Sequence, residues 1–133
     1  MATHKRIVPL ESEEQQALFQ WVRLMEGRYP ELRLMYHIPN GGLRNKPIAV
    51  RLTAQGVRRG VPDICLPVVR HGFHSLYIEL KRLAGGGATA EQAEWIDELH
   101  REGNKAIVCR GWLAAKEAIE KYLRQPDAMP FED

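Results

Sequence analysis

Two short apolar runs separated by a polar turn constrain the fold of this 133-residue chain more than any other feature. The runs cover residues 64–69 and 76–80, and His71-Gly72 lies between them. Apolar runs of this length around a glycine-containing turn are typical of a β-hairpin. The middle of the chain is therefore expected to form two neighbouring strands of a sheet.

Three charged residues accompany this hairpin. Asp63 precedes the first run, whereas Glu79 and Lys81 are alternate residues of the second and project from the same face of a strand. Burying two carboxylates together is unfavourable unless a cation lies between them, because each ion loses several kcal/mol of hydration. Oxygen ligands of this kind suit Mg²⁺. Lys81 could orient an attacking water or stabilise charge on a phosphate.

The same three residues also have a purely structural interpretation. Asp63 follows Pro62 and could be a turn residue, while Glu79 and Lys81 could form a solvated stripe on an edge strand. The hairpin alone does not separate the two interpretations, so the rest of the chain decides between them.

Length and composition indicate one globular domain. Residues 11–124 are expected to form it, with an extension at 1–10 and a loosely held tail at 125–133. The net charge of +2 permits nucleic-acid binding without requiring it. Cys65 and Cys109 each lie in an apolar run and are expected to be buried thiols. The absence of a long apolar run predicts no membrane contact and a cytoplasmic location.

The first expected element is a helix over residues 11 to about 26. Glu14 lies on its apolar side, one turn before Leu18, and Glu11 continues that line. Either acid could point toward the metal site, and Glu14 is the preferred candidate. Alternatively, residues 12–15 fit a capping box, and acids are common in a first helical turn.

A basic region follows. Residues 32–38 are expected to form a strand, 39–44 a tight loop and 47–55 a helix. Five cations cluster here without any acid, and they predict a phosphate-contacting surface rather than a merely solvated face. The candidate DNA-binding residues are Asn40, Gly41, Gly42, Arg44, Lys46, Arg51, Arg58 and Arg59.

The last third of the chain alternates between helices and a strand. A helix begins near Thr89 and carries Gln92, which either completes a capping box or lies beside the active site. A strand over residues 105–110 and a helix through 112–123 follow. The order helix, strand, helix, strand, strand, helix, strand, helix predicts an α/β fold with a mixed sheet flanked by helices.

Several motifs in this order resemble those of the VRR-NUC domain family, over residues from about 11 to 123. They are Glu14-Gln15, Pro39-Asn40-Gly41-Gly42, Gly56, Gly60-Val61-Pro62-Asp63, Ile78-Glu79-Leu80-Lys81, Gln92 and Trp95. The pair Pro62-Asp63 with Glu79-Leu80-Lys81 is similar to the P-D…(D/E)-x-K signature of restriction-endonuclease-like nucleases. The letters VRR are not evident before Pro62, where the chain reads Arg58-Arg59-Gly60-Val61.

The resemblance implies a DNA phosphodiesterase that depends on Mg²⁺ or Mn²⁺. Asp63 and Glu79 would be metal ligands, together with the Leu80 carbonyl. Lys81 would orient the attacking water, Glu14 would complete the site, and Gln92 would be a site neighbour. Small phage and bacterial members of the family resemble Holliday junction resolvases, which implies a homodimer acting on branched or duplex DNA in a bacterial or phage-infected cell. A flap or nicking endonuclease and a non-catalytic DNA-binding protein of the same fold are the alternatives.

Overall fold

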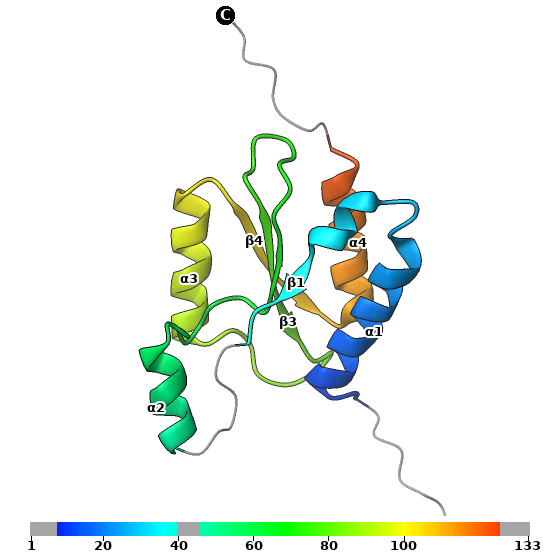
Figure 1. Cartoon of the computed structure of the whole chain (residues 1–133). Coiled ribbons are helices and arrows are strands. Elements are labelled where there is room, and N and C mark those ends of the chain that lie inside the picture. The colour runs from blue at the N-terminus through cyan, green and yellow to red at the C-terminus, as the bar shows by residue number, and fades with distance from the viewer. Residues whose placement is uncertain (1–7, 40–45, 126–133) are drawn as a thin grey trace, which may run out of the picture.

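A computed structural model describes residues 8–39 and 46–125 of the chain. A single mixed sheet runs through its centre, with helices on both sides (Figure 1). The elements are α1 (Glu11–Met25), the 3₁₀ helix η1 (Pro30–Leu34), β1 (Tyr36–His37), α2 (Lys46–Ala54), β2 (Ile64–Leu66), β3 (Leu76–Lys81), α3 (Ala90–Arg101), β4 (Lys105–Arg110) and α4 (Trp112–Leu123). Apart from η1, this is the order expected from the sequence, and the α/β class is confirmed.

The sheet has the strand order β1-β2-β3-β4. The β1–β2 and β2–β3 pairs are antiparallel, whereas β3 and β4 are parallel and are connected through α3. The predicted hairpin is present, because Ile64 pairs with Ile78. Its turn closes through an Arg70–Phe73 bridge, and Gly72 adopts a positive φ of 81°.

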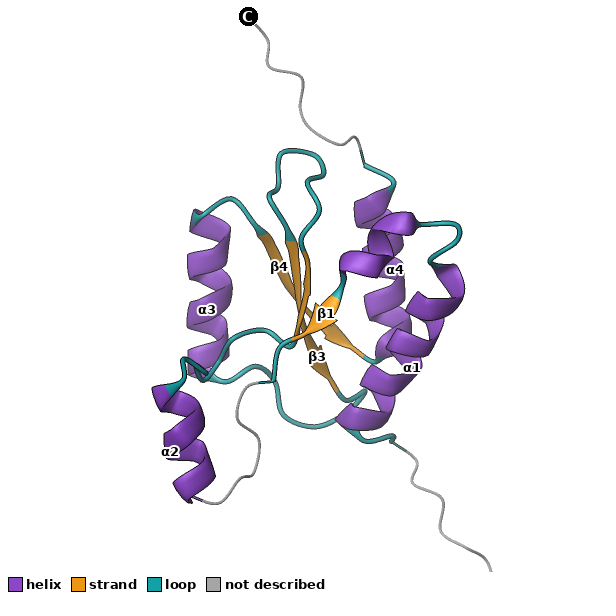
Figure 2. Cartoon of the chain, in the orientation of Figure 1, coloured by secondary structure: helices purple, strands orange, loops and turns teal. Residues whose placement is uncertain are grey.

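The hydrophobic core lies between the sheet and the helix pair α1 and α4 (Figure 2). Leu76, Ile78 and Leu80 are alternate residues of β3 and are almost fully buried. Leu18 of α1 and Ile119 of α4 are completely buried in the same cluster. Since strand side chains alternate between faces, Glu79 and Lys81 point to the other face, where α3 lies.

The expectation of a strand over residues 32–38 was wrong for its first half. Pro30 begins a 3₁₀ helix, and proline suits this position because its ring fixes φ and its missing N–H is not needed there. Leu32 and Met35, three residues apart, are both buried, and the Met35 N–H donates to the Leu32 carbonyl. A spacing of three matches the 3₁₀ turn, in which such side chains align. The strand is therefore limited to Tyr36–His37.

The first strand of the hairpin is also shorter than expected. β2 ends at Leu66, because Pro67 has no N–H to continue the ladder. Cys65 and Cys109 are free and buried, as the sequence predicted. Within the described ranges, the helices are all too short or too polar to cross a bilayer.

Candidate metal centre and nucleic-acid interface

Three carboxylates from separate parts of the chain converge at one end of the sheet. Glu11 is the first residue of α1, Asp63 immediately precedes β2, and Glu79 lies in β3. Each side chain offers an oxygen, and these oxygens all lie within 4.8 Å of one another. The backbone N–H of Leu80 donates to Asp63 Oδ2 at 2.9 Å, which fixes the Asp63 carboxylate against β3. Asp63 and Glu79 are buried, whereas Glu11 lies at the exposed edge of the cluster.

The two oxygens of Glu79 have different surroundings. Oε2 accepts a hydrogen bond from Gln92 Nε2 at 2.9 Å and lies 3.3 Å from Lys81 Nζ. Oε1 is buried and has no hydrogen-bond partner among the described residues. A buried carboxylate oxygen without a donor is costly unless a cation occupies the space that it faces. The three clustered carboxylates, Glu79 among them, each offer a hard oxygen donor and together fit a divalent ion such as Mg²⁺ or Mn²⁺.

The electrostatics of the cluster also favour an added positive charge. Burial, followed by the nearby Asp63 carboxylate, raises the pKa of Glu79 to about 7. Burial likewise raises the pKa of Asp63, although the Leu80 N–H opposes this shift. The pKa of Glu11 is raised by burial and by Asp63. Because each carboxyl group is more easily protonated than usual, a cation among them would relieve both the desolvation and the repulsion.

Lys81 lies where strand alternation predicted it. Its ammonium group contacts Glu79 Oε2, and the side chain is only 12% exposed. A long side chain held in this way presents one fixed positive charge beside the carboxylates. It can orient a water molecule or stabilise negative charge that develops on a phosphate oxygen.

Gln92 occupies both of the positions considered for it. It forms a capping box with Thr89, since the Gln92 N–H donates to Thr89 Oγ1 and Gln92 Oε1 accepts from the Thr89 N–H. Its Nε2 atom is left free to donate to Glu79. The cap of α3 therefore holds the amide that orients a candidate metal ligand.

Glu14 lies in a different place from the three clustered acids. It is 4% exposed, and its Oε1 atom accepts the Trp112 N–H at 3.0 Å at the start of α4. This contact satisfies one of the free N–H groups that every helix N-terminus carries. The acid of α1 that reaches Asp63 and Glu79 is Glu11, whereas the sequence pattern favoured Glu14 as the acid of the metal site.

Comparisons with known proteins identify the family of this chain. The family model described as the VRR-NUC domain matches residues 5–112, which is most of the chain. This chain belongs to the VRR-NUC domain family. A solved structure titled "VRR_NUC domain protein" is similar, with a TM-score of 0.78 and 28% sequence identity over 94% of this chain and 97% of that one. None of the curated proteins matches the chain.

A VRR-NUC domain is a nuclease domain, so the chain is a nuclease, which implies that it binds DNA. Nuclease domains of this kind are metal-dependent. The acidic cluster is the part of the described structure that suits such an ion. The Leu80 N–H fixes Asp63 there, whereas the role of the Leu80 carbonyl as a metal ligand stays a prediction.

The predicted basic surface of this VRR-NUC domain is described only in part. Asn40, Gly41, Gly42 and Arg44 lie outside the described residues, whereas Lys46, Arg51, Arg58 and Arg59 are all exposed. No residue of α2 is buried, so this helix presents its cations to solvent. The Arg59 guanidinium lies 3.7 Å from Glu91 in an exposed ion pair, which is a weak contact.

Gly60 and Trp95 connect the loop that carries Arg58 and Arg59 of the VRR-NUC domain to α3. Trp95 Nε1 donates to the Arg59 carbonyl at 2.9 Å. Gly60 has a φ of +87°, and a Cβ atom there would lie 2.9 Å from Trp95 Cδ1. Only glycine fits this close approach without strain, and it leads directly to Pro62 and Asp63.

His37 is a site neighbour that the sequence did not indicate. Its Nδ1 atom lies 2.9 Å from the Asp63 carbonyl oxygen, and after the Leu80 N–H it partly opposes the rise that burial causes in the pKa of Asp63. The contact depends on the pairing of β1 with β2, in which His37 is opposite Ile64. No local sequence signal predicts a contact between residues 26 positions apart.

Proposed function

We propose that this chain is a structure-specific DNA endonuclease that hydrolyses phosphodiester bonds with Mg²⁺ or Mn²⁺. Glu11, Asp63 and Glu79 hold the ion. The observation that carries the proposal is the buried, unpaired Oε1 atom of Glu79 within a cluster of three carboxylates. A protein that only bound DNA would gain nothing from acids gathered where phosphates approach.

Each remaining group at the site has a role that follows from its contacts. Lys81, 3.3 Å from Glu79, orients the attacking water and stabilises charge on the phosphate. Gln92 and the Leu80 N–H hold the Glu79 and Asp63 carboxylates in position. The bound cation would supply Lewis-acid polarisation of the phosphodiester.

Branched DNA is the proposed substrate, and four-way junctions are the preferred form. The exposed cations Lys46, Arg51, Arg58 and Arg59 favour binding through phosphates, which carries no base-sequence information. Two symmetric nicks across a junction require two active sites, so this function includes a homodimer. Light scattering at working concentration should then report a dimer, and a monomer alone would contradict the resolvase assignment.

Cleavage assays with matched variants test the catalytic proposal. Wild-type protein should cut labelled DNA in Mg²⁺ or Mn²⁺ and lose this activity in EDTA. The variants Asp63→Asn, Glu79→Gln and Lys81→Ala should lose cleavage but retain the fold and most of the DNA binding. Full activity in a clean Lys81→Ala preparation would reject the assignment.

A panel of DNA structures tests the substrate. Junctions, flaps, nicked duplexes and linear duplexes of the same sequence would be compared under identical conditions. Faster cutting of the junction supports a resolvase, whereas a preference for flaps or nicks supports the alternative endonuclease. Absence of metal-dependent cleavage on every substrate would indicate a protein that only binds DNA.

A further inference from the structure

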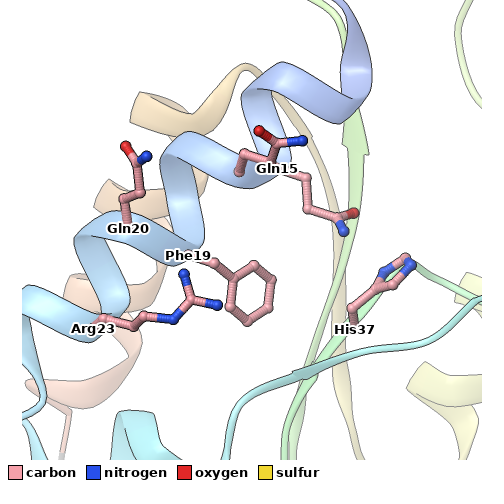
Figure 3. A pocket seen from close by; sticks show the side chains of 6 residues that line it. Gln15, Phe19, Gln20, Arg23 and His37 are labelled. Atoms are coloured by element: carbon pink, nitrogen blue, oxygen red, sulfur yellow. The ribbon is translucent and has the colours of Figure 1, made fainter.

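A groove lies between α1 and β1, beside the acidic cluster. Its volume is about 420 Å³, which is within the usual range for a site that holds a small organic group. Figure 3 shows the side chains around it, and in this view the Phe19 ring lies between Arg23 and His37. Among the described residues, those that line it are Gln15, Gln16, Phe19, Gln20, Arg23 and His37.

The groove adjoins the candidate metal centre at two points. Gln15 is four residues after Glu11, so the two residues are neighbours on consecutive turns of α1. His37 contacts the Asp63 carbonyl at 2.9 Å from the opposite wall. A DNA strand with one phosphate at the acidic cluster would therefore have its adjoining nucleotide at the mouth of the groove.

Gln15, Phe19 and Arg23 form one row along α1, at successive intervals of four residues. Phe19 packs against the core with one side and is still partly exposed. The side chains of Gln15 and Arg23 form no hydrogen bond or ion pair within residues 8–39 and 46–125. The row thus presents an amide, an aromatic face and a guanidinium group, all available to a ligand.

These three groups match the parts of one nucleotide. Aromatic rings stack on bases, amides donate to and accept from base edges, and guanidinium groups bind phosphate oxygens. In a continuous duplex both faces of each base are covered by neighbouring bases, so Phe19 could not stack on one. A base that has left the duplex exposes a face for it.

We propose that this groove binds one unpaired nucleotide next to the cleaved phosphate, with its base on Phe19 and a flanking phosphate on Arg23. The inference rests on the proposed nuclease function and refines its substrate. It selects DNA in which a base is unpaired at a branch point, such as the base of a flap or an opened junction centre.

A fluorescent base analogue tests the groove directly. The experiment uses the 133-residue chain with Asp63→Asn, in which cleavage is blocked, and branched DNA with one unpaired 2-aminopurine at the branch. Stacking on Phe19 should change the 2-aminopurine emission on binding. Phe19→Leu, which keeps an apolar side chain against the core, should abolish this change and weaken binding about tenfold. Phe19→Tyr, which keeps an aromatic ring, should retain both the emission change and the affinity.

Matched controls separate the groove from α1 as a whole. Leu24→Ala changes an α1 side chain that is 82% exposed and does not line the groove, so it should leave the signal and the affinity unchanged. Arg23→Gln should weaken binding and lower its salt dependence, because one phosphate contact is lost. A folded Phe19→Leu protein with unchanged emission and affinity would overturn the proposal.

The cleavage assay keeps this inference distinct from the proposed function. If the wild-type protein cuts branched DNA but no fluorescence change depends on Phe19, the proposal for the groove is rejected and the proposed nuclease function stands. If the fluorescence change depends on Phe19 but the wild-type protein cuts none of the DNA substrates, nucleotide binding in the groove is supported and the proposed nuclease function is rejected. A placement of 2-aminopurine within the paired arm should give no signal, and an equal signal there would contradict binding of an unpaired base.

Discussion

The Glu14 carboxylate caps α4, because its Oε1 atom accepts the Trp112 N–H at 3.0 Å. This contact joins residues 98 positions apart and holds the start of α1 against the start of α4. Glu11, one turn earlier on α1, has its carboxylate in the acidic cluster instead. The two acids of one helical turn thus have different surroundings, which implies different consequences when each is removed.

We expect Glu14→Ala to lower the free energy of unfolding by about 1–2 kcal/mol, since a helix cap is lost and a partly buried N–H is left without a partner. The Glu14→Ala variant should keep its nuclease activity at saturating metal. Glu11→Ala should leave stability nearly unchanged but weaken metal binding and cleavage. Urea unfolding, calorimetric Mn²⁺ titration and a cleavage assay on both variants test this. Equal loss of metal affinity in both would contradict the assignment of Glu11.

Removal of the Gln92 amide should reduce metal affinity or activity by about 10–100-fold, the usual effect of losing a group that orients a metal ligand. Gln92→Ala takes away the donor to Glu79 Oε2. Thr89→Ala is the matched control, because it removes the hydroxyl acceptor at the α3 cap and leaves the Gln92 amide in place. If Thr89→Ala lost as much activity as Gln92→Ala, the effect would come from α3 and not from Glu79.

Metal-free protein should become less stable as the pH rises from about 4.5 to above 7. The pKa of Glu79 is raised from 4.5 to about 7 in the folded state, so the folded protein binds more protons than the unfolded chain within this window. The stabilisation is complete below pH 4.5 and is lost as the pH rises through 7. Urea unfolding in EDTA at several pH values measures it.

The variant Glu79→Gln should reduce this slope without removing it, because the pKa values of Asp63 and Glu11 are raised in the same direction. Added Mn²⁺ should stabilise the wild-type protein more at pH 8 than at pH 5, since the ion binds ionised carboxylates. A wild-type stability that increased steadily with pH in EDTA would contradict the buried acidic cluster.

Gly60→Ala should destabilise the protein by more than backbone strain alone, which costs about 1–2 kcal/mol for a left-handed residue. Its new Cβ would lie 2.9 Å from Trp95 Cδ1. Gly56 also has a positive φ, but the space around it is open, and Gly27 has open space and no positive φ. Gly56→Ala and Gly27→Ala are the matched controls. Thermal unfolding should therefore rank the losses as Gly60, then Gly56, then Gly27. Equal losses for Gly60→Ala and Gly56→Ala would show that the approach to Trp95 is unimportant.

Local chemistry was enough to predict much of this protein from its sequence. The alternation of strand side chains placed Glu79 and Lys81 on one face, and the apolar runs around His71-Gly72 predicted the hairpin that pairs β2 with β3. The Thr89 cap of α3 followed from its residue types. These features depend on backbone geometry over a few residues, which the sequence specifies directly.

Tertiary packing decided the rest. Glu11 and Glu14 lie on nearly the same side of a helix, and only the packing of α1 against α4 determines which one reaches Asp63. His37 reaches Asp63 through a strand pairing, and the groove beside Phe19 exists because β1 passes opposite α1. Such contacts join residues far apart in the chain, so their geometry depends on how whole elements rotate and dock, and no local pattern records it.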